Sequence, residues 1–309
     1  RELEQIMTDT WITVFPEHLR SRLSLEEIKQ IQLEEIRFRV GQPVWIVFAG
    51  GGGAMPGLEY YRVTLQDMEQ IVSYISRYSI YAFEEEIQKG YLTLEGGHRV
   101  GLAGQVILEE NRIRTIRPIT YLNFRIAHQI YGCAMGMLPW IRNMDRVCNT
   151  LILSPPGTGK TTMLRDLVRM LSNGENGQVG LKVGLVDERS EIAGCRNGVP
   201  QNEIGLRTDV MDGCPKVQGM MMLVRSMSPQ VLAVDEIGSR EDLEAVEYAS
   251  NCGCAVLATM HCTDLAELRE KQIWKIEHYR SVFSRYILLQ QLDGQRSFQV
   301  FDEQLVRLC

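Results

Sequence analysis

Long apolar runs are missing from this 309-residue sequence. A membrane-spanning helix needs roughly 20 apolar residues. The two longest apolar stretches, Val44–Ala49 and Tyr131–Ile141, are too short or are interrupted by glycine and proline. The opening residues, Arg1–Glu4, do not have the pattern of a signal peptide. We therefore expect a cytoplasmic protein.

Basic charge is also scarce. The sequence contains 33 lysines and arginines against 39 aspartates and glutamates, which gives a formal net charge of −6. A protein that coats nucleic acid usually carries a strong positive field. We therefore expect no nucleic-acid partner, although this composition does not exclude a local basic groove.

Disulfide and zinc patterns are lacking as well. The eight cysteines show no disulfide-framework spacing, which fits a reducing compartment. Cys252, Cys254, His261 and Cys262 lie close together in the sequence, but their spacing matches no common zinc pattern. Small thiols also suit a buried strand, so we predict no zinc site here.

What the sequence does contain is a strand–loop–helix pattern at Leu151–Thr162, LILSPPGTGKTT. An apolar strand enters a loop of glycine and proline, which ends in Lys-Thr and begins an amphipathic helix. This is the phosphate-binding loop (P-loop) pattern, with Ser154 where the consensus has glycine. The alternative is a strand–turn–helix with accidental glycines, which the order of the three parts disfavours. The chain is therefore expected to bind a nucleoside triphosphate.

Each residue type in this loop suits a triphosphate. Gly157 and Gly159 allow the backbone to curl so that N–H groups point at phosphate oxygens, and the helix directs its positive end at the same point. Lys160 would reach the β- and γ-phosphates, and the Thr161 hydroxyl would ligate Mg²⁺. The residues assigned to ATP binding are Pro156, Gly157, Thr158, Gly159, Lys160, Thr161 and Thr162.

Residues 1–130 are predicted to form an α+β domain. Alternation at Glu35–Val40 and the apolar run Val44–Phe48 indicate a β-hairpin. The glycines at Gly50–Gly53 predict a loose turn before a third strand at Tyr60–Val63, and later alternating segments complete a curved, mostly antiparallel sheet, with a break at Pro118. This half carries no complete catalytic motif.

Arginines are frequent on the predicted strands of this first half. Most should lie on solvated strand faces. Arg117 and Arg125 lie nearest the P-loop domain in the sequence. They are our candidates for clamping the triphosphate of a neighbouring subunit, because the guanidinium fork matches phosphate oxygens.

From about residue 131 to residue 309 the sequence alternates between strands and helices, which is typical of a parallel α/β sheet. The predicted strands are Asn149–Ser154, Lys182–Asp187, Val231–Asp235 and Cys254–Thr259. Each is followed by polar residues at its carboxyl end, where ligands bind in open α/β sheets. We therefore predict a nucleotide-binding domain over residues 131–309.

A second nucleotide motif, Val231–Glu236, ends one of these strands in two acids. Asp235 would hold Mg²⁺ directly or through water, and Glu236 would orient or deprotonate the attacking water. An apolar strand that ends in Asp-Glu is weak evidence alone. Downstream of Lys160, with one strand–helix unit between them, it supports an ATPase site.

Other polar residues follow the neighbouring strands. His261 would contact the γ-phosphate, which we favour over a structural role because of its place at the active edge. Asp187 and Glu188 would point into the same cleft, unless they form a solvated turn. The sequence leaves open whether Glu188 or Glu236 is the base.

The polar segment Gly194–Asp212 is predicted to be a long loop near the site. Arg207 within it, and Arg225 on the next helix, could engage phosphate across a subunit boundary. After His261 fewer than fifty residues remain. They leave no room for the multi-helix lid of most remodelling ATPases.

Together these segments resemble the type II/IV secretion ATPase superfamily, and within it a group from endospore-forming bacteria. The resemblance covers the P-loop, the acidic strand end Asp187–Glu191, the arginine-containing helix before Glu236, the Thr259-x-His261 box and an arginine-rich first domain with Glu35–Pro43. The chain departs from the superfamily pattern at Ser154 and at Asp235, since both positions usually hold glycine.

The resemblance implies a RecA-like fold and a homo-hexameric ring, with the nucleotide between the two domains of the subunit. It also implies ATP hydrolysis with Mg²⁺ by a motor that docks, on the mother-cell side, on membrane-embedded components of a sporulation or secretion channel. Its membrane association would be peripheral and would depend on those partners.

Two other functions stay open. PPGTGKT is common in ATP-dependent nucleic-acid loaders and remodellers, although the missing lid and the acidic composition disfavour that class. DNA-stimulated, salt-dependent activity would favour it. A nucleotide-gated scaffold that binds ATP and barely hydrolyses it is the third hypothesis.

Overall fold

The computed structural model describes residues 10–28, 30–48, 50–76, 91–109, 112–143, 146–175, 177–271, 275, 281–292 and 295–309. The chain divides into two compact units, residues 1–128 and 129–309. The predicted division at residue 130 falls close to this one. Among the described residues, no helix is long and apolar enough to cross a membrane.

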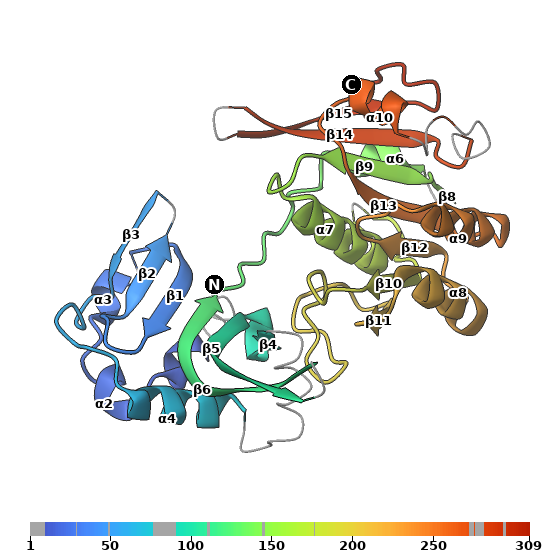
Figure 1. Ribbon diagram of the computed structural model, residues 1–309. Helices are drawn as coiled ribbons and strands as arrows, with labels where there is room; N and C mark the ends of the chain where they lie inside the picture. Colours follow the sequence, from blue (N-terminus) through green and yellow to red (C-terminus); the bar gives the residue numbers. More distant parts are fainter. Residues whose placement is uncertain are drawn as a thin grey trace. The chain divides into compact units, whose positions relative to one another are not determined.

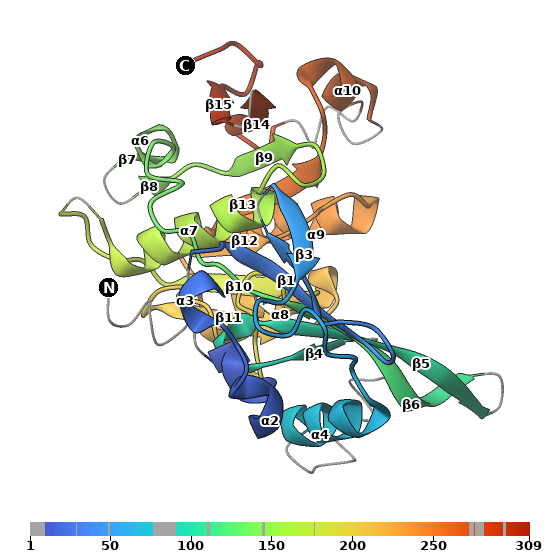
Figure 2. The same ribbon diagram turned by 90° about the vertical axis from the view of Figure 1, so that its left-hand side faces the viewer.

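The first unit is built on a six-stranded sheet with the order β3-β2-β1-β6-β5-β4. Its strand pairs are antiparallel. The strands are β1 (Leu33–Arg39), β2 (Trp45–Phe48), β3 (Gly51–Ala54), β4 (Tyr91–Thr93), β5 (Arg99–Glu109) and β6 (Arg112–Arg125). β5 and β6 continue past their neighbours as a two-stranded ribbon (Figure 2).

Short helices complete the core of this unit. They are a 3₁₀ helix at Thr10–Val14, α2 (Glu17–Arg20), α3 (Leu25–Ile28) and α4 (Leu65–Ile75), with a second 3₁₀ turn at Glu95–Gly97. α4 begins at a capping box in which Thr64 and Asp67 bond each other's backbone N–H groups. Its buried Met68 and Ile71 belong to the same cluster as Phe38 on β1.

Two details of the first unit differ from the sequence prediction. The glycines expected to form a turn instead make strand β3, whose backbone pairs with β2, while Tyr60–Val63 is not a strand. Strand pairing uses backbone hydrogen bonds, which glycine can make, so a run of glycines can pair with the edge of β2. Pro118 does not end its strand, because β6 continues through it and the register with β5 shifts nearby.

The second unit contains a seven-stranded sheet with the order β11-β10-β12-β13-β9-β14-β15. All neighbouring pairs are parallel except β14–β15. Its strands are β9 (Thr150–Ser154), β10 (Val183–Asp187), β11 (Thr208–Asp212), β12 (Val231–Val234), β13 (Ala255–His261), β14 (Arg285–Leu292) and β15 (Gln295–Phe301). A separate two-stranded sheet is formed by β7 (Arg142–Asn143) and β8 (Arg146–Val147). The four predicted strands of this half are confirmed, whereas β11 lies in the segment that we predicted to be a loop.

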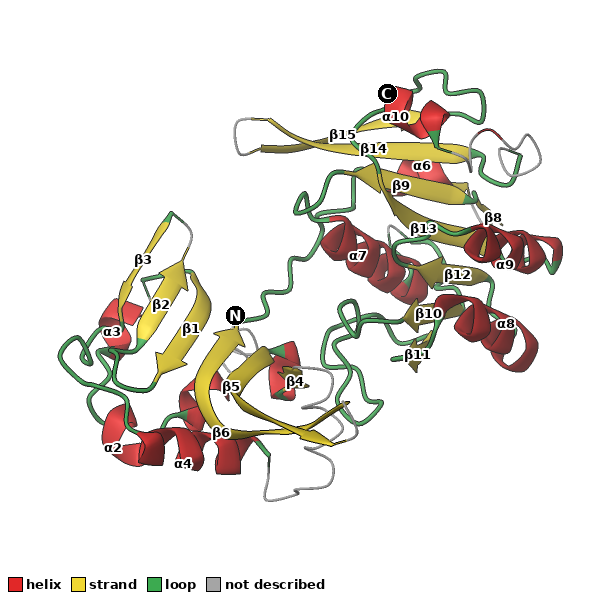
Figure 3. Ribbon diagram, viewed as in Figure 1, coloured by secondary structure: helices red, strands yellow, loops and turns green. Residues whose placement is uncertain are grey.

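Helices cover both faces of this sheet, as Figures 1 and 3 show. The helices are α6 (Leu138–Ile141), α7 (Lys160–Asn173), α8 (Lys216–Met227), α9 (Arg240–Asn251) and α10 (Leu265–Glu270). α6 and α7 pack on one face, where Leu164 joins Val231 and Leu257 in one cluster. α8 and α9 pack on the other face, which Leu232 and Val256 line. Successive side chains of each strand thus supply the two opposite cores.

Candidate nucleotide-binding site

The P-loop joins the buried strand β9 to helix α7. Gly157 and Gly159 have φ angles of 78° and 96°, which a residue with a Cβ rarely adopts. Gly159 is the N-cap of α7, so the helix begins at Lys160. Thr158 donates its hydroxyl to the carbonyl of Pro155 at 3.0 Å, which closes the turn. The loop predicted from the sequence therefore has the backbone that lets its N–H groups converge on an anion.

Strand register places His261 beside the start of the loop. His261 on β13 pairs with Ser154 on β9, and the N–H of Cys262 donates to the carbonyl of Ser154 at 3.1 Å. Ser154 is fully buried in this ladder, with its hydroxyl directed to the carbonyl of Pro155. A serine at the first loop position is thus compatible with regular strand geometry.

Thr161 and Asp235 bring two oxygen ligands together. The Thr161 hydroxyl donates to Oδ2 of Asp235 at 2.9 Å, and the Thr259 hydroxyl donates to Oδ1 of the same carboxylate. Mg²⁺ prefers oxygen ligands, and in nucleotide sites it usually takes only one or two from the protein. The Thr161–Asp235 pair therefore fits Mg²⁺ whose remaining ligands are phosphate oxygens and water. Within the described ranges, no group of three or more His, Cys, Asp or Glu side chains could hold a metal ion.

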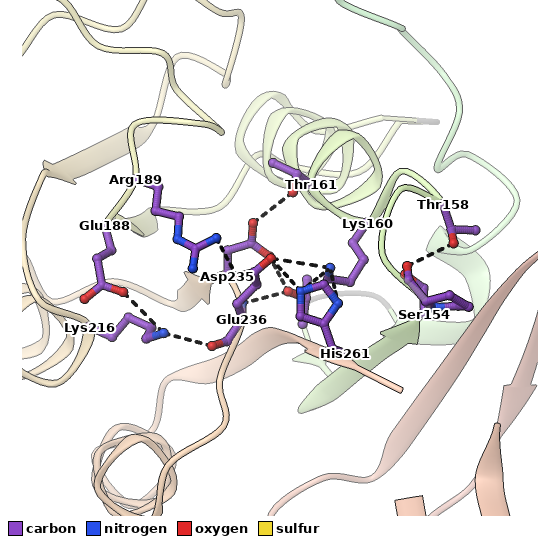
Figure 4. Close-up of polar contacts among 12 residues, drawn as sticks. Ser154, Thr158, Lys160, Thr161, Glu188, Arg189, Lys216, Asp235, Glu236 and His261 are labelled. Carbon is purple, nitrogen blue, oxygen red and sulfur yellow. Dashed lines mark hydrogen bonds and ion pairs between the residues drawn. The ribbon is translucent and has the colours of Figure 1, made fainter. Parts of the chain in front are cut away.

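Lys160, Glu236 and His261 form the centre of the site (Figure 4). The Lys160 ammonium lies 3.6 Å from Oε1 of Glu236 and 3.2 Å from Nδ1 of His261, and Nε2 of His261 lies 2.9 Å from the same Glu236 oxygen. A neutral His261 protonated at Nε2 satisfies both contacts, because it donates to Glu236 and accepts from Lys160. Lys160 is 5% exposed, and Glu236 and His261 supply the polar partners that a buried ammonium needs.

Glu236 is held in an unusual backbone conformation. Its φ angle is 53°, a value uncommon outside glycine. Its N–H donates to the Thr259 hydroxyl at 2.8 Å, and the N–H of Ile237 donates to the Thr259 carbonyl at 2.8 Å. Burial by itself would raise the pKa of Glu236, but Arg189, Lys160 and His261 hold it below the ordinary value for glutamate. This carboxylate therefore stays ionised near neutral pH.

Arg189 and Lys216 are two residues of the site that sequence reasoning missed. Nη1 of Arg189 lies 3.0 Å from Oε2 of Glu236. Nζ of Lys216 donates to the carbonyl of Glu236 at 2.8 Å and lies 3.3 Å from Oε2 of Glu188. Both cations follow strands, β10 and β11, at the edge where the site lies. Their position at that edge was the available signal.

Asp187 lies at the same edge, but its carboxylate has a structural role. It accepts the N–H groups of Glu191, Ile192 and Ala193 at 2.8–3.0 Å. Its side chain is 2% exposed, and burial raises its pKa above the ordinary value even though these donors oppose the shift. Asp187 lines the same cavity as Glu188, as expected, but its carboxylate is taken up by backbone donors. Asp187, Glu188, Arg189, Glu191, Lys216, Asp235 and Glu236 together line one small cavity.

The four candidate arginines make other contacts. Arg207 donates to the carbonyl of Ser172, near the C-terminal end of α7, whereas the P-loop lies at its N-terminal end. Arg225 is in the last turn of α8, with its guanidinium 5.9 Å from the ring centre of Tyr248. Arg117 and Arg125 are exposed on β6 of the first unit. A role for these arginines toward a neighbouring subunit stays a prediction.

The P-loop strand β9 is separated from the acidic strand β12 by β13, and the fold of this sheet is RecA-like. Solved structures agree: the ATPase DotB of Legionella pneumophila matches with a TM-score of 0.60 and 15% identity, covering 90% of this chain and 79% of DotB. The pilus retraction motor PilT, solved with bound ADP, matches with a TM-score of 0.60 and 15% identity, covering 90% of this chain and 82% of PilT.

The sequence comparisons then give the family. Residues 7–308 match the family described as "Sporulation stage III, protein AA". Stage III sporulation protein AA of Bacillus subtilis (strain 168) is 42% identical over 292 residues, which cover 94% of each chain. The chain belongs to the sporulation stage III protein AA family, and its fold matches that of the ATPase DotB and the motor PilT.

Proposed function

We propose that this protein binds ATP with Mg²⁺ and hydrolyses it to ADP and phosphate. The observation that carries the proposal is the convergence of Lys160, Asp235, Glu236 and His261 beside the P-loop, within the contact distances given above. A cation that reaches toward phosphates, an oxygen pair for Mg²⁺ and an ionised carboxylate are the groups that phosphoryl transfer to water needs.

The assignment of roles follows from these contacts. Thr161 and Asp235 would hold Mg²⁺, which neutralises charge on the phosphates when bound. Glu236 is our choice for the residue that orients or deprotonates water, because its carboxylate lies beside Lys160. Glu188 is the weaker candidate, since Lys216 holds its carboxylate farther along the edge. Glu191 lines the same cavity and is a third acid to compare.

Phosphate would rearrange the centre of the site. Lys160 is ion-paired with Glu236, and phosphate oxygens would compete for the same ammonium. Once phosphate takes over Lys160, Oε1 of Glu236 would keep only His261 as a partner and could accept a proton from water. His261 would then link the γ-phosphate to Glu236, in keeping with the γ-phosphate contact that the sequence predicts for it.

The assembly proposal rests on the family. We infer a homo-hexameric ring that works on the cytoplasmic, mother-cell side, with membrane-embedded components of a sporulation or secretion channel as partners. A secretion-ATPase fold and the membership of a sporulation family support this proposal. No nucleic-acid partner is proposed, given the net charge of −6.

One observation favours a second function. Arg189, Lys160 and His261 all contact the Glu236 carboxylate, and a base engaged by three partners is poorly placed to accept a proton. A nucleotide-gated scaffold with very slow turnover would need only this arrangement. An assembled ring that binds ATP without measurable phosphate release, even with its membrane partner, would favour the scaffold.

Lys160→Ala tests the ATP site directly. We expect ATP affinity to fall about tenfold to hundredfold, the usual worth of a charge-assisted contact to phosphate, and hydrolysis to be lost. Lys182→Ala is the matched control, because Lys182 is an exposed lysine just before β10. Binding can be measured by calorimetry, and ring formation by mass measurement with and without ATP and Mg²⁺. Unchanged affinity in Lys160→Ala would overturn the proposal, and DNA-stimulated hydrolysis would favour the nucleic-acid alternative.

A further inference from the structure

Arg296 lies against the P-loop, although it is far from it in the sequence. It belongs to β15, the last strand of the sheet. A Cβ built on Gly159 would lie only 3.0 Å from Cζ of Arg296, and 3.2 and 3.3 Å from its two terminal nitrogens. All three distances are short, so the guanidinium packs directly on the glycine that precedes Lys160. Glycine at position 159 thus permits both the left-handed turn and the approach of this arginine.

Among the described residues, the charge of Arg296 acts on the Cys133 thiol but is paired with no acidic side chain. Over the described part of the chain, its guanidinium takes part in no hydrogen bond or ion pair, and the side chain is exposed. Asp166, a buried acid on α7, is already bonded by Arg169 and by the N–H of Ala134. A guanidinium placed on an anion-binding loop with no protein anion of its own is suited to an anionic ligand.

The order of strands indicates which part of a nucleotide Arg296 would meet. β9 lies between β13 on one side and β14, followed by β15, on the other. The hydrolytic groups Glu236 and His261 come from the β12–β13 side, so the γ-phosphate belongs on that side of the loop. Arg296 reaches the loop from the opposite side. It therefore approaches the phosphates that ADP and ATP share.

We propose that Arg296 binds the α- or β-phosphate of the nucleotide held by the P-loop of its own subunit, as a cation supplied by the C-terminal hairpin β14–β15. The proposal rests on the ATP site proposed above. Arg296 is a binding residue and takes no part in the proton transfer. It should contribute to the affinity for ADP as much as to the affinity for ATP.

The experiment measures ATP and ADP affinities of the full chain by calorimetry, with Arg296→Ala, Arg296→Gln and Arg296→Lys. We expect the first two variants to weaken both nucleotides equally, by about tenfold to hundredfold, and the lysine variant to restore part of the loss. Adenosine, which has no phosphate, tests whether the contact is to the base. Arg307→Ala is the matched control, because Arg307 carries the same charge and donates to the carbonyl of Cys309.

The outcomes separate this proposal from the one it rests on. Normal ADP and ATP affinity in folded Arg296→Gln, together with weakened binding in Lys160→Ala, would overturn the role of Arg296 and leave the ATP site standing. A loss for ATP alone, or an equal loss for adenosine, would also overturn it. Unchanged binding in Lys160→Ala would overturn the ATP site itself. Thermal unfolding of each variant shows whether it is folded, and Arg296→Lys replaces any variant that is not.

Discussion

Charged residues are arranged differently in the two sheets of this protein. In the antiparallel sheet of the first unit, charges alternate along the strands and pair locally, as Glu35 does with Arg37 and Arg125. In the parallel sheet of the second unit, the strands β9, β10 and β12 are buried along their length and the charges gather beyond their carboxyl ends. Glu236 there contacts three cationic or ionisable partners from three different segments.

Topology explains this difference. Neighbouring antiparallel strands run in opposite directions, so the polar residues that follow them lie at both ends of the sheet. Neighbouring parallel strands all finish at the same end, so the polar residues that follow them lie together. The burial follows the same rule: every residue of β9, β10 and β12 is buried, while β1 alternates. We therefore expect single changes at the carboxyl edge of the second sheet to have large effects, and changes of exposed charges in the first unit to have small ones.

The largest effect is expected for Glu236→Gln. The amide keeps the size of the side chain but cannot take a proton, so the rate of phosphate release at saturating ATP should fall about 10²–10⁴-fold. ATP binding should be retained, because Lys160 loses an ionic competitor. Glu188→Gln and Glu191→Gln should have smaller effects, and Glu244→Gln, on the exposed face of α9, serves as the control. A larger loss in Glu188→Gln than in Glu236→Gln would reverse our assignment of the base.

The pH dependence of stability gives a second test at Glu236. The neighbouring cations lower its pKa in the folded state, so the ionised carboxylate stabilises the fold at pH values above the unfolded value, near 4.5. That contribution is lost as the pH falls through the folded pKa. Urea unfolding at several pH values should therefore show a difference between wild type and Glu236→Gln that is constant near neutrality and shrinks below about pH 4.5.

How much of the site could be predicted from the sequence depended on how each residue is placed. Asp235 directly follows an apolar strand and His261 ends one, while Lys160 begins α7 after the P-loop motif, so the sheet and the motif bring them together. Arg189 lies in a turn in which Ser190 has a φ of 52°, and Arg296 reaches the loop only through the pairing of β14 with β15. Neither the turn conformation nor the strand pairing is specified by local spacing, so both residues were missed.

The fold shows the same limit. Buried parallel strands were predicted to within a few residues, because four or five consecutive apolar residues have few alternatives. The edge strands β3 and β11 were missed, since an edge strand is defined by its neighbour's free hydrogen-bonding groups more than by its own side chains. The direction of the Asp187 side chain depended on the turn after β10, which no periodicity describes.

An intermediate effect is expected for Asp187. Asp187→Ala leaves three N–H groups without an acceptor, two of them buried, and should lower the free energy of unfolding of the second unit by about 3 kcal/mol. Asp187→Asn should cost less, since its amide oxygen can still accept two of them. Burial raises the pKa of Asp187 in the folded protein. The free energy of unfolding should therefore fall as the pH rises through the folded pKa and the carboxyl group ionises. Asp187→Asn should remove this pH dependence, because its side chain does not ionise. Hydrogen exchange at residues 191–193 reports the loss directly, and unchanged protection there would contradict the structural role.

The smallest effects are expected for Arg125→Ala and Arg37→Ala in the first unit. Both arginines face Glu35, whose side chain is 20% exposed, and such surface pairs contribute at most about 1 kcal/mol each. Unfolding measurements should find two small, similar losses. Arg125 is also a candidate for contacting the triphosphate of a neighbouring subunit. If it does so, Arg125→Ala lowers ATP turnover whereas Arg37→Ala does not. Mixing Arg125→Ala subunits with Lys160→Ala subunits then restores part of the activity. Arg117→Ala can be mixed in the same way. Wild-type turnover in all of these arginine variants would mean that the arginines of the first sheet form only local ion pairs. The comparison of the two sheets predicts this for most of those arginines.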